Sequence, residues 1–128
     1  MNKSRFLIFT LSLTLAAAVL FAAGAVDLSG TWKGFAENEG YPDNVTVVLE
    51  KAGDTYTGTV TDEMGMFPNS SIQNFVVIED TVTFEFEGNY EGTPFTLKAE
   101  MTLDEGTMKG TWTVDSLGAS GILELTKE

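Results

Sequence analysis

The stretch PFTLKAEMTLD, residues 94–104, decides the fold class of this chain because apolar and polar residues alternate along it. Phe95 and Leu97 begin the apolar series, and Thr96 and Lys98 begin the polar one. Successive side chains of an extended strand point to opposite faces. The period of two therefore predicts a strand with one buried face and one solvated face.

The same period recurs across the chain after residue 25, in VTVVLEK, TVTFEFE and TMKGTWTVD among others. No window there combines helical spacing with capping residues. Short connections rich in glycine, aspartate and glutamate separate the segments, and such tight turns join antiparallel neighbours. The pattern predicts eight strands, at residues 29–37, 45–51, 55–62, 72–79, 81–87, 94–103, 107–115 and 121–127.

Eight antiparallel strands can close into a barrel or form two stacked sheets. A glycine, threonine and large residue follow one another three times, beginning at Gly30, Gly58 and Gly110. A glycine inside a strand marks a bend or a close backbone approach, and barrels use such glycines at their corners under an aromatic cover. Three unrelated hairpin glycines are the alternative. With Trp32 and Trp112 as covers, the repeats favour a closed, all-β, up-and-down barrel.

The stretches SGTW, TGTV and KGTW resemble the lipocalin and avidin group of barrels, in which Gly30 and Trp32 would plug the barrel floor. The resemblance also extends to small exported bacterial domains with this layout, and it implies a lipocalin-like, calycin-type fold. Lys33 and Val60 stand where avidin-type proteins place residues that contact biotin, so biotin binding is not carried over. The chain also lacks the cysteines of a lipocalin disulfide and a histidine to ligate haem.

Residues 1–25 have the pattern of a secretory signal peptide, with Lys3 and Arg5 before an uncharged run that ends in Ala23, Gly24 and Ala25. An uncleaved membrane anchor is the alternative, because about 20 apolar residues can span a bilayer. We expect a division into a signal peptide, residues 1–25, and a barrel domain, residues 26–128. The domain would be exported to the periplasm or the extracellular space, with no stable membrane insertion after cleavage.

The formal net charge of the chain is −12, and residues 26–128 alone carry five lysines and all 19 acidic residues, which gives −14. Binding to a phosphate backbone depends on lysine and arginine. Nucleic acid is therefore not an expected partner, and the sequence specifies no protein partner.

Catalysis by an activated serine or cysteine needs a neighbouring base, most often histidine, and the chain contains neither histidine nor cysteine. Glu85 and Glu87 alternate with apolar residues and should face solvent. We expect no enzyme activity, no cofactor, no metal site and no buried carboxyl group with a strongly raised pKa.

The interior is the remaining candidate for function, because an eight-stranded barrel can be filled by side chains or can hold one small ligand. The short strands favour a packed core, whereas small residues such as Gly34, Ala36, Gly58, Ala99 and Gly110 would leave gaps. The predicted inward-facing set contains no charged residue and consists of Trp32, Val45, Val47, Leu49, Tyr56, Val60, Val82, Phe84, Phe86, Phe95, Leu97, Met101, Met108, Trp112, Val114, Leu123 and Leu125.

The loop DEMGMFPNSS, residues 62–71, places apolar residues among turn formers. It could cover the barrel mouth or form an adhesive tip, and the alternative is that Met64, Met66 or Phe67 merely cap the core. The first hypothesis is an exported binding protein that holds a small apolar ligand in the barrel mouth. The alternative is a solid barrel that acts as a protein-interaction or inhibitor module in the cell envelope, through an exposed patch in this loop. The candidate ligand-binding residues are Trp32, Phe84, Phe86, Phe95, Met101, Trp112, Met64, Met66 and Phe67.

Overall fold

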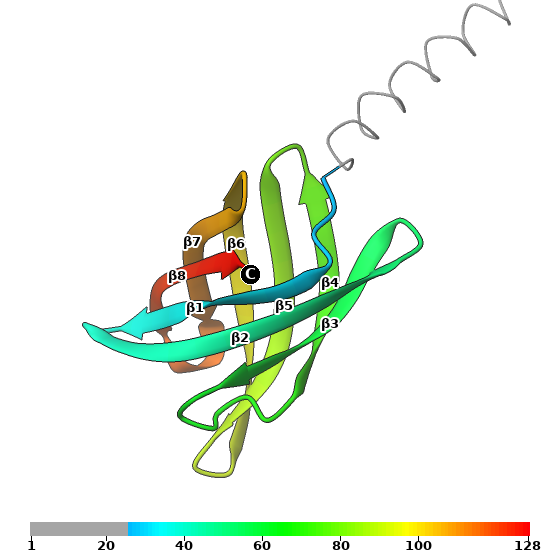
Figure 1. Ribbon diagram of the computed structural model, residues 1–128. Coiled ribbons are helices and arrows are strands. Elements are labelled where there is room, and N and C mark those ends of the chain that lie inside the picture. The colour runs from blue at the N-terminus through cyan, green and yellow to red at the C-terminus, as the bar shows by residue number, and fades with distance from the viewer. Residues whose placement is uncertain (1–25) are drawn as a thin grey trace, which may run out of the picture.

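The computed structural model describes residues 26–128, which form a closed barrel of eight antiparallel strands in sequential order (Figure 1). The predicted signal peptide, residues 1–25, lies outside the described residues. A single turn of 3-10 helix, η1 (Asp115–Leu117), precedes the last strand. The strands are β1 (Gly30–Asn38), β2 (Tyr41–Ala52), β3 (Thr55–Asp62), β4 (Ser70–Ile78), β5 (Thr81–Tyr90), β6 (Thr93–Asp104), β7 (Thr107–Val114) and β8 (Ala119–Lys127).

Closure of the sheet is direct, because β1 pairs with both β2 and β8. The predicted up-and-down barrel is therefore confirmed, and the alternative of two stacked sheets is wrong. The shortest seam joins β3 to β4, where only Thr59 with Ser71 and Val60 with Ser70 are paired. Within residues 26–128, no helix is long and apolar enough to cross a membrane.

Three strands are longer than predicted because tight turns extend them. β2 begins at Tyr41 rather than at residue 45, and Pro42 and Asp43 pair with β1. The connection before it is only Glu39 and Gly40, both with positive φ, the conformation that matches the twist of a hairpin. A second turn of the same kind, Glu91–Gly92, lets β5 continue to Tyr90 and β6 begin at Thr93.

A β-bulge in β4 changes which residues face inward. The pairing with β5 shifts between Gln73 and Val76, and Asn74 lies at a φ of 53°. A bulge inserts one extra residue into a strand and so reverses the alternation beyond it. Ile72 and Phe75 are consequently both buried, three positions apart.

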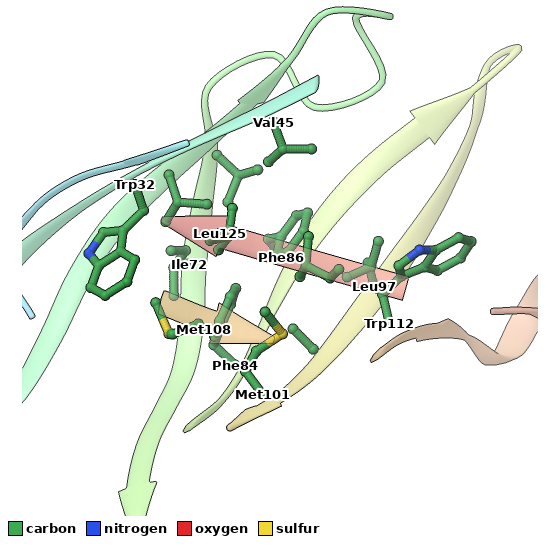
Figure 2. Packing of buried hydrophobic residues seen from close by; sticks show 14 of the residues in the cluster. Trp32, Val45, Ile72, Phe84, Phe86, Leu97, Met101, Met108, Trp112 and Leu125 are labelled. Atoms are coloured by element: carbon green, nitrogen blue, oxygen red, sulfur yellow. The ribbon is translucent and has the colours of Figure 1, made fainter. Parts of the chain in front are cut away.

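All members of the predicted inward-facing set are buried. The core also contains Leu28, Phe67, Ile72, Phe75 and Ala99, of which Ala99 was expected to line a gap and the others were not in the set. Figure 2 shows Trp32 and Trp112 at opposite ends of this cluster, with Phe86 and Leu125 between them. The two tryptophans therefore belong to different ends of the barrel.

The end that holds Trp32, here called the base, is closed by the segment before β1. The indole Nε1 of Trp32 donates a hydrogen bond to the Leu28 carbonyl oxygen (2.8 Å), and the Leu28 backbone N–H donates one to the Tyr56 hydroxyl (3.0 Å). Leu28 is almost fully buried. The base is therefore sealed by protein atoms, in agreement with the expected plug at the barrel floor.

The opposite end, here called the mouth, carries the β1–β2, β3–β4, β5–β6 and β7–β8 connections. The long β3–β4 loop and the β5–β6 hairpin lie together at this end (Figure 1). The Asn89 backbone N–H donates a hydrogen bond to the Met66 carbonyl oxygen (3.0 Å), which ties the loop to β5.

Candidate functional site

The barrel interior is filled by side chains. The residual void between the two ends measures about 10 Å³, whereas a cavity needs roughly 10–15 Å³ to hold even one water molecule. The gaps expected at Gly34, Gly58 and Gly110 are absent, because a Cβ atom at each would overlap a carbonyl oxygen of the neighbouring strand. Gly58 and Gly110 mark close approaches of two backbones, as the corner interpretation predicts. At Gly30, the third predicted corner, a Cβ atom would meet only the Lys127 side chain, at 3.2 Å, so a close backbone approach is absent there.

Trp112 covers a further glycine of this kind. It pairs with Gly121 across the β7–β8 ladder, where a Cβ atom would lie 2.7 Å from the indole nitrogen. The indole Nε1 also donates a hydrogen bond to the Glu37 carbonyl oxygen (3.2 Å). Trp112 therefore covers a glycine, but this glycine, Gly121, is not one of the three predicted corners.

A pocket of about 430 Å³ opens at the mouth. This volume lies within the range of about 300–1,000 Å³ that is usual for small-molecule sites. Most of its wall is apolar or aromatic, with a few polar groups. The lining residues are Ala36, Asn38, Glu39, Tyr41, Asp43, Met64, Met66, Phe67, Tyr90, Phe95, Leu97, Trp112, Val114, Leu117 and Ala119.

Phe67 forms the floor of this pocket and separates it from the filled interior. It is 3% exposed, and its ring contacts Phe86 and Phe95 edge to face, at centroid distances of 4.8 and 5.7 Å. Gly88 makes room for it, because a Cβ atom there would lie 2.5 Å from the Phe67 ring. Gly88 occupies an inward position of β5, so the ring from the loop fills the space of the missing side chain.

Two carboxyl groups hold this loop over the mouth. Asp43 Oδ1 accepts a hydrogen bond from the Met64 backbone N–H (3.1 Å), and Asp62 Oδ1 accepts one from the Phe67 backbone N–H (2.8 Å). Asp43 is on β2 and Asp62 ends β3, one diagonal step apart on the inward face. Side chains in this relation are within reach of each other.

The second oxygen of each carboxyl, Oδ2, is buried without a hydrogen-bond partner. Burial of Asp43 raises its pKa to about 7, and the neighbouring carboxyl of Asp62 acts in the same direction. A protonated Asp43 can donate a hydrogen bond to Asp62. The expectation that no buried carboxyl has a strongly raised pKa is therefore wrong.

The structure separates the predicted ligand-binding residues into two groups. Phe95, Trp112, Met64, Met66 and Phe67 line the mouth pocket. The other four, Trp32, Phe84, Phe86 and Met101, are buried in the filled core and do not line it.

The predicted loop is partly a lid and partly core. Phe67 is buried and Met66 packs against the core, whereas Met64 is 61% exposed. An exposed patch of all three residues, as an interaction module would present there, is therefore absent. Instead, exposed apolar groups surround the pocket, at Tyr41, Met64, Tyr90 and Leu117.

Sequence reasoning missed Asp43 and Asp62 as members of the site. A signal was present, since Asp43 is in phase with Val45 and Val47 and would face inward if the strand continued through Pro42. Among residues 26–128 there is no group of three or more acidic, histidine or cysteine side chains arranged to hold a metal ion. A shallow depression of about 320 Å³ on the outer faces of β5–β7 is lined mainly by polar residues.

Comparisons with protein-family models, with curated proteins and with solved structures give no match for this chain. The closed eight-stranded antiparallel barrel is consistent with a calycin-like fold.

Proposed function

We propose that residues 26–128 form an exported, lipocalin-like binding domain that takes one small, mainly apolar molecule at the barrel mouth. The observation that carries this proposal is the pocket of about 430 Å³, with a mostly apolar wall, above an interior that has no room for a ligand. Concave, largely apolar sites with a few polar groups are the usual form of small-molecule sites. The ligand would rest on Phe67, between Phe95 and Trp112.

Binding accounts for the site better than catalysis does. Asp43 lines the pocket, and burial raises its pKa to about 7. A carboxyl group without a neighbouring nucleophile supplies only proton transfer. Asp43 Oδ1 is already engaged by the loop backbone. We therefore infer that the carboxyl pair positions the loop and sets the polarity of the pocket.

The test uses the two tryptophans as separate reporters. Trp112 lines the pocket and Trp32 is buried at the base. In a Trp32→Phe variant, the tryptophan fluorescence therefore comes from Trp112 at the mouth alone. Titration with the neutral hydrophobic probe N-phenyl-1-naphthylamine should enhance probe emission by energy transfer from Trp112. Ala119→Phe, which narrows the pocket, should weaken binding at least about tenfold. Ala52→Phe, at the exposed end of β2 at the base, is the matched control.

Equal probe binding by the Ala119→Phe variant and the unmodified protein would show that the probe sits elsewhere. Export is tested separately, by sequencing the amino terminus of protein secreted by the native host. Cleavage as proposed leaves Val26 as the first residue, whereas an intact residue 1 in the exported protein contradicts it.

The exposed rim favours a second candidate, a protein-interaction or inhibitor module in the cell envelope. Tyr41 is 75% exposed beside Met64 and Tyr90, and aromatic residues of this kind are enriched at protein interfaces. Replacing Tyr41 and Tyr90 by serine should then abolish capture of an envelope partner and leave probe binding in the pocket unchanged. Unchanged capture would eliminate the module.

A further inference from the structure

We propose that the ligand of the mouth pocket is a small organic cation, an ammonium group on an aromatic or alkyl body, with Asp43 as its counter-charge. This inference rests on the proposed function, since it names the class of ligand for the same pocket.

The first step concerns the charge that the pocket wall carries. Asp43 lines the pocket, is only 6% exposed, and has one oxygen without a donor. A buried carboxylate is costly unless a partner of opposite charge or a proton compensates it. In the empty pocket, protonation of Asp43, whose pKa is raised to about 7, supplies that compensation.

The second step is that, among residues 26–128, the pocket lining contains no positive charge. Three acidic residues lie on the neighbouring segments: Asp62 at the end of β3, Glu63 in the β3–β4 loop and Glu39 in the β1–β2 turn. Across the β1–β2 ladder, Asp43 is paired with Ala36, which is uncharged. The remaining titratable lining groups are two tyrosines, and none of the lysines of the part of the chain that the structure describes lines the pocket. A ligand is therefore the available source of a compensating cation, and an anionic ligand would be repelled.

The third step concerns the aromatic wall. Trp112, Tyr41, Tyr90 and Phe95 line the same pocket as Asp43. Aromatic rings attract cations through their electron-rich faces, and aromatic cages are the common way in which proteins bind quaternary ammonium groups. A neutral hydrocarbon would use this wall without Asp43, whereas an organic ammonium ion would use both.

Proton linkage follows from the same arrangement. A cation beside Asp43 favours the ionised carboxylate and so lowers the pKa of that carboxyl. Since the pKa of Asp43 is about 7 in the empty pocket, cation binding should strengthen as the pH rises from 5 to 8. Binding at pH 7 should release about half a proton from the protein.

The experiment compares two probes of the same shape that differ in charge. Benzyltrimethylammonium and neopentylbenzene are isosteric, with nitrogen in one and carbon in the other, and neither titrates. At pH 8 the cation should bind at least about tenfold more tightly, a difference of about 1.4 kcal/mol. At pH 5 this advantage should shrink to roughly threefold or less, because Asp43 is then protonated.

Asp43→Asn should abolish the advantage of the cation and keep the binding of neopentylbenzene. Asp54→Asn, in the exposed turn at the base, is the matched control and should change neither affinity. Calorimetry of the unmodified protein at pH 7, in two buffers of different ionisation enthalpy, measures proton release without any substitution. Release should accompany the cation and not the hydrocarbon.

Equal affinity for the two probes at pH 8 would overturn the cation inference and leave the binding function standing. The same holds if the Asp43→Asn variant keeps the preference, or if no proton is released. If neither probe binds at any pH, the proposed function fails together with this inference.

Discussion

Substitution of Asp43 by asparagine should remove a loss of stability that the unmodified protein undergoes as the pH rises. The ordinary pKa of an aspartate is 3.8, and in the folded barrel the pKa of Asp43 is about 7. Between these values the folded state holds a proton that the unfolded state has released. The stabilising contribution of the Asp43 proton to the free energy of unfolding is therefore complete below pH 3.8, falls as the pH rises, and is lost above pH 7.

The structure sets the size of the effect. Each pH unit between the two pKa values changes the free energy of unfolding by about 1.4 kcal/mol, so the whole interval corresponds to at most about 4 kcal/mol. Asparagine cannot ionise, its Oδ1 can still accept the Met64 N–H, and its Nδ2 can donate to Asp62. Local opening of the loop would solvate the pair before global unfolding, so we expect between about 2 and 4 kcal/mol.

The assay is urea unfolding, followed by tryptophan fluorescence, of both proteins between pH 4.5 and 8. The quantity to plot is the free energy of unfolding of the variant minus that of the unmodified protein, because the other carboxyl groups cancel in this difference. It should rise with pH and level off above pH 7. The Asp54→Asn control should give a flat line.

A difference that stays constant within about 0.5 kcal/mol, or that falls with pH, would refute the argument. Either result would mean that Asp43 is solvated or already charged in the folded protein. The loop would then be held by its packing and by hydrogen bonds to an ionised Asp43, and the pocket would carry a permanent charge.

Three further predictions test the packing. Phe67→Ala removes a ring that contacts two others at 4.8 and 5.7 Å, so it should cost about 3 kcal/mol in urea unfolding and admit larger probes, whereas unchanged probe affinities would contradict its place as the pocket floor. Gly110→Ala places a methyl group on the Glu100 carbonyl oxygen and should lower the free energy of unfolding by more than about 2 kcal/mol. The control Gly106→Ala, where the space is open, should lower it by less than about 1 kcal/mol. Equal losses of stability would contradict a close backbone approach at Gly110. Trp112→Phe breaks a hydrogen bond of 3.2 Å and should cost about 1 kcal/mol while weakening probe binding, and unaltered binding would remove that indole from the site.

The closed barrel could be predicted from the sequence because alternation and turns are local signals. Each strand reads as a period of two, and the corner glycines identify where two strands approach. At Gly58 and Gly110 the expected close approach is what the structure contains. The inward-facing set follows from the same parity, since the phase of a strand fixes the face of every residue in it.

Alternation predicts the wrong face, or no face at all, where a strand contains a bulge or is longer than expected. The bulge at Asn74 moves Phe75 to the inner face, and nothing in the local sequence announces that step. Pro42 and Asp43 are turn formers in isolation, but the two-residue turn before them keeps the chain in the ladder. Whether such residues form a loop or a strand depends on the partner strand, which a local pattern does not contain.

The site was harder to predict for the same reason. Phe67 comes from the irregular β3–β4 loop, and its position depends on a vacancy at Gly88 on another strand. Asp43 and Asp62 are 19 residues apart and meet only because β2 and β3 pair. The sequence therefore indicated the loop as important, and the structure alone shows that two carboxyl groups hold it.

The carboxyl groups that hold the loop over the pocket also set the charge of the pocket, so the order of the loop and the affinity for a charged ligand are coupled. Asp43 accepts a hydrogen bond from the loop through one oxygen, and burial together with the neighbouring Asp62 raises its pKa to about 7. Loss of the proton from Asp43 places a buried negative charge beside Asp62 under the loop, which weakens the hold on Phe67. A cation in the pocket offsets this repulsion without a proton, so the ligand that suits the pocket would also keep the loop closed above neutral pH. In this barrel the loop order and the affinity for a cationic ligand should therefore change with pH through one pair of side chains.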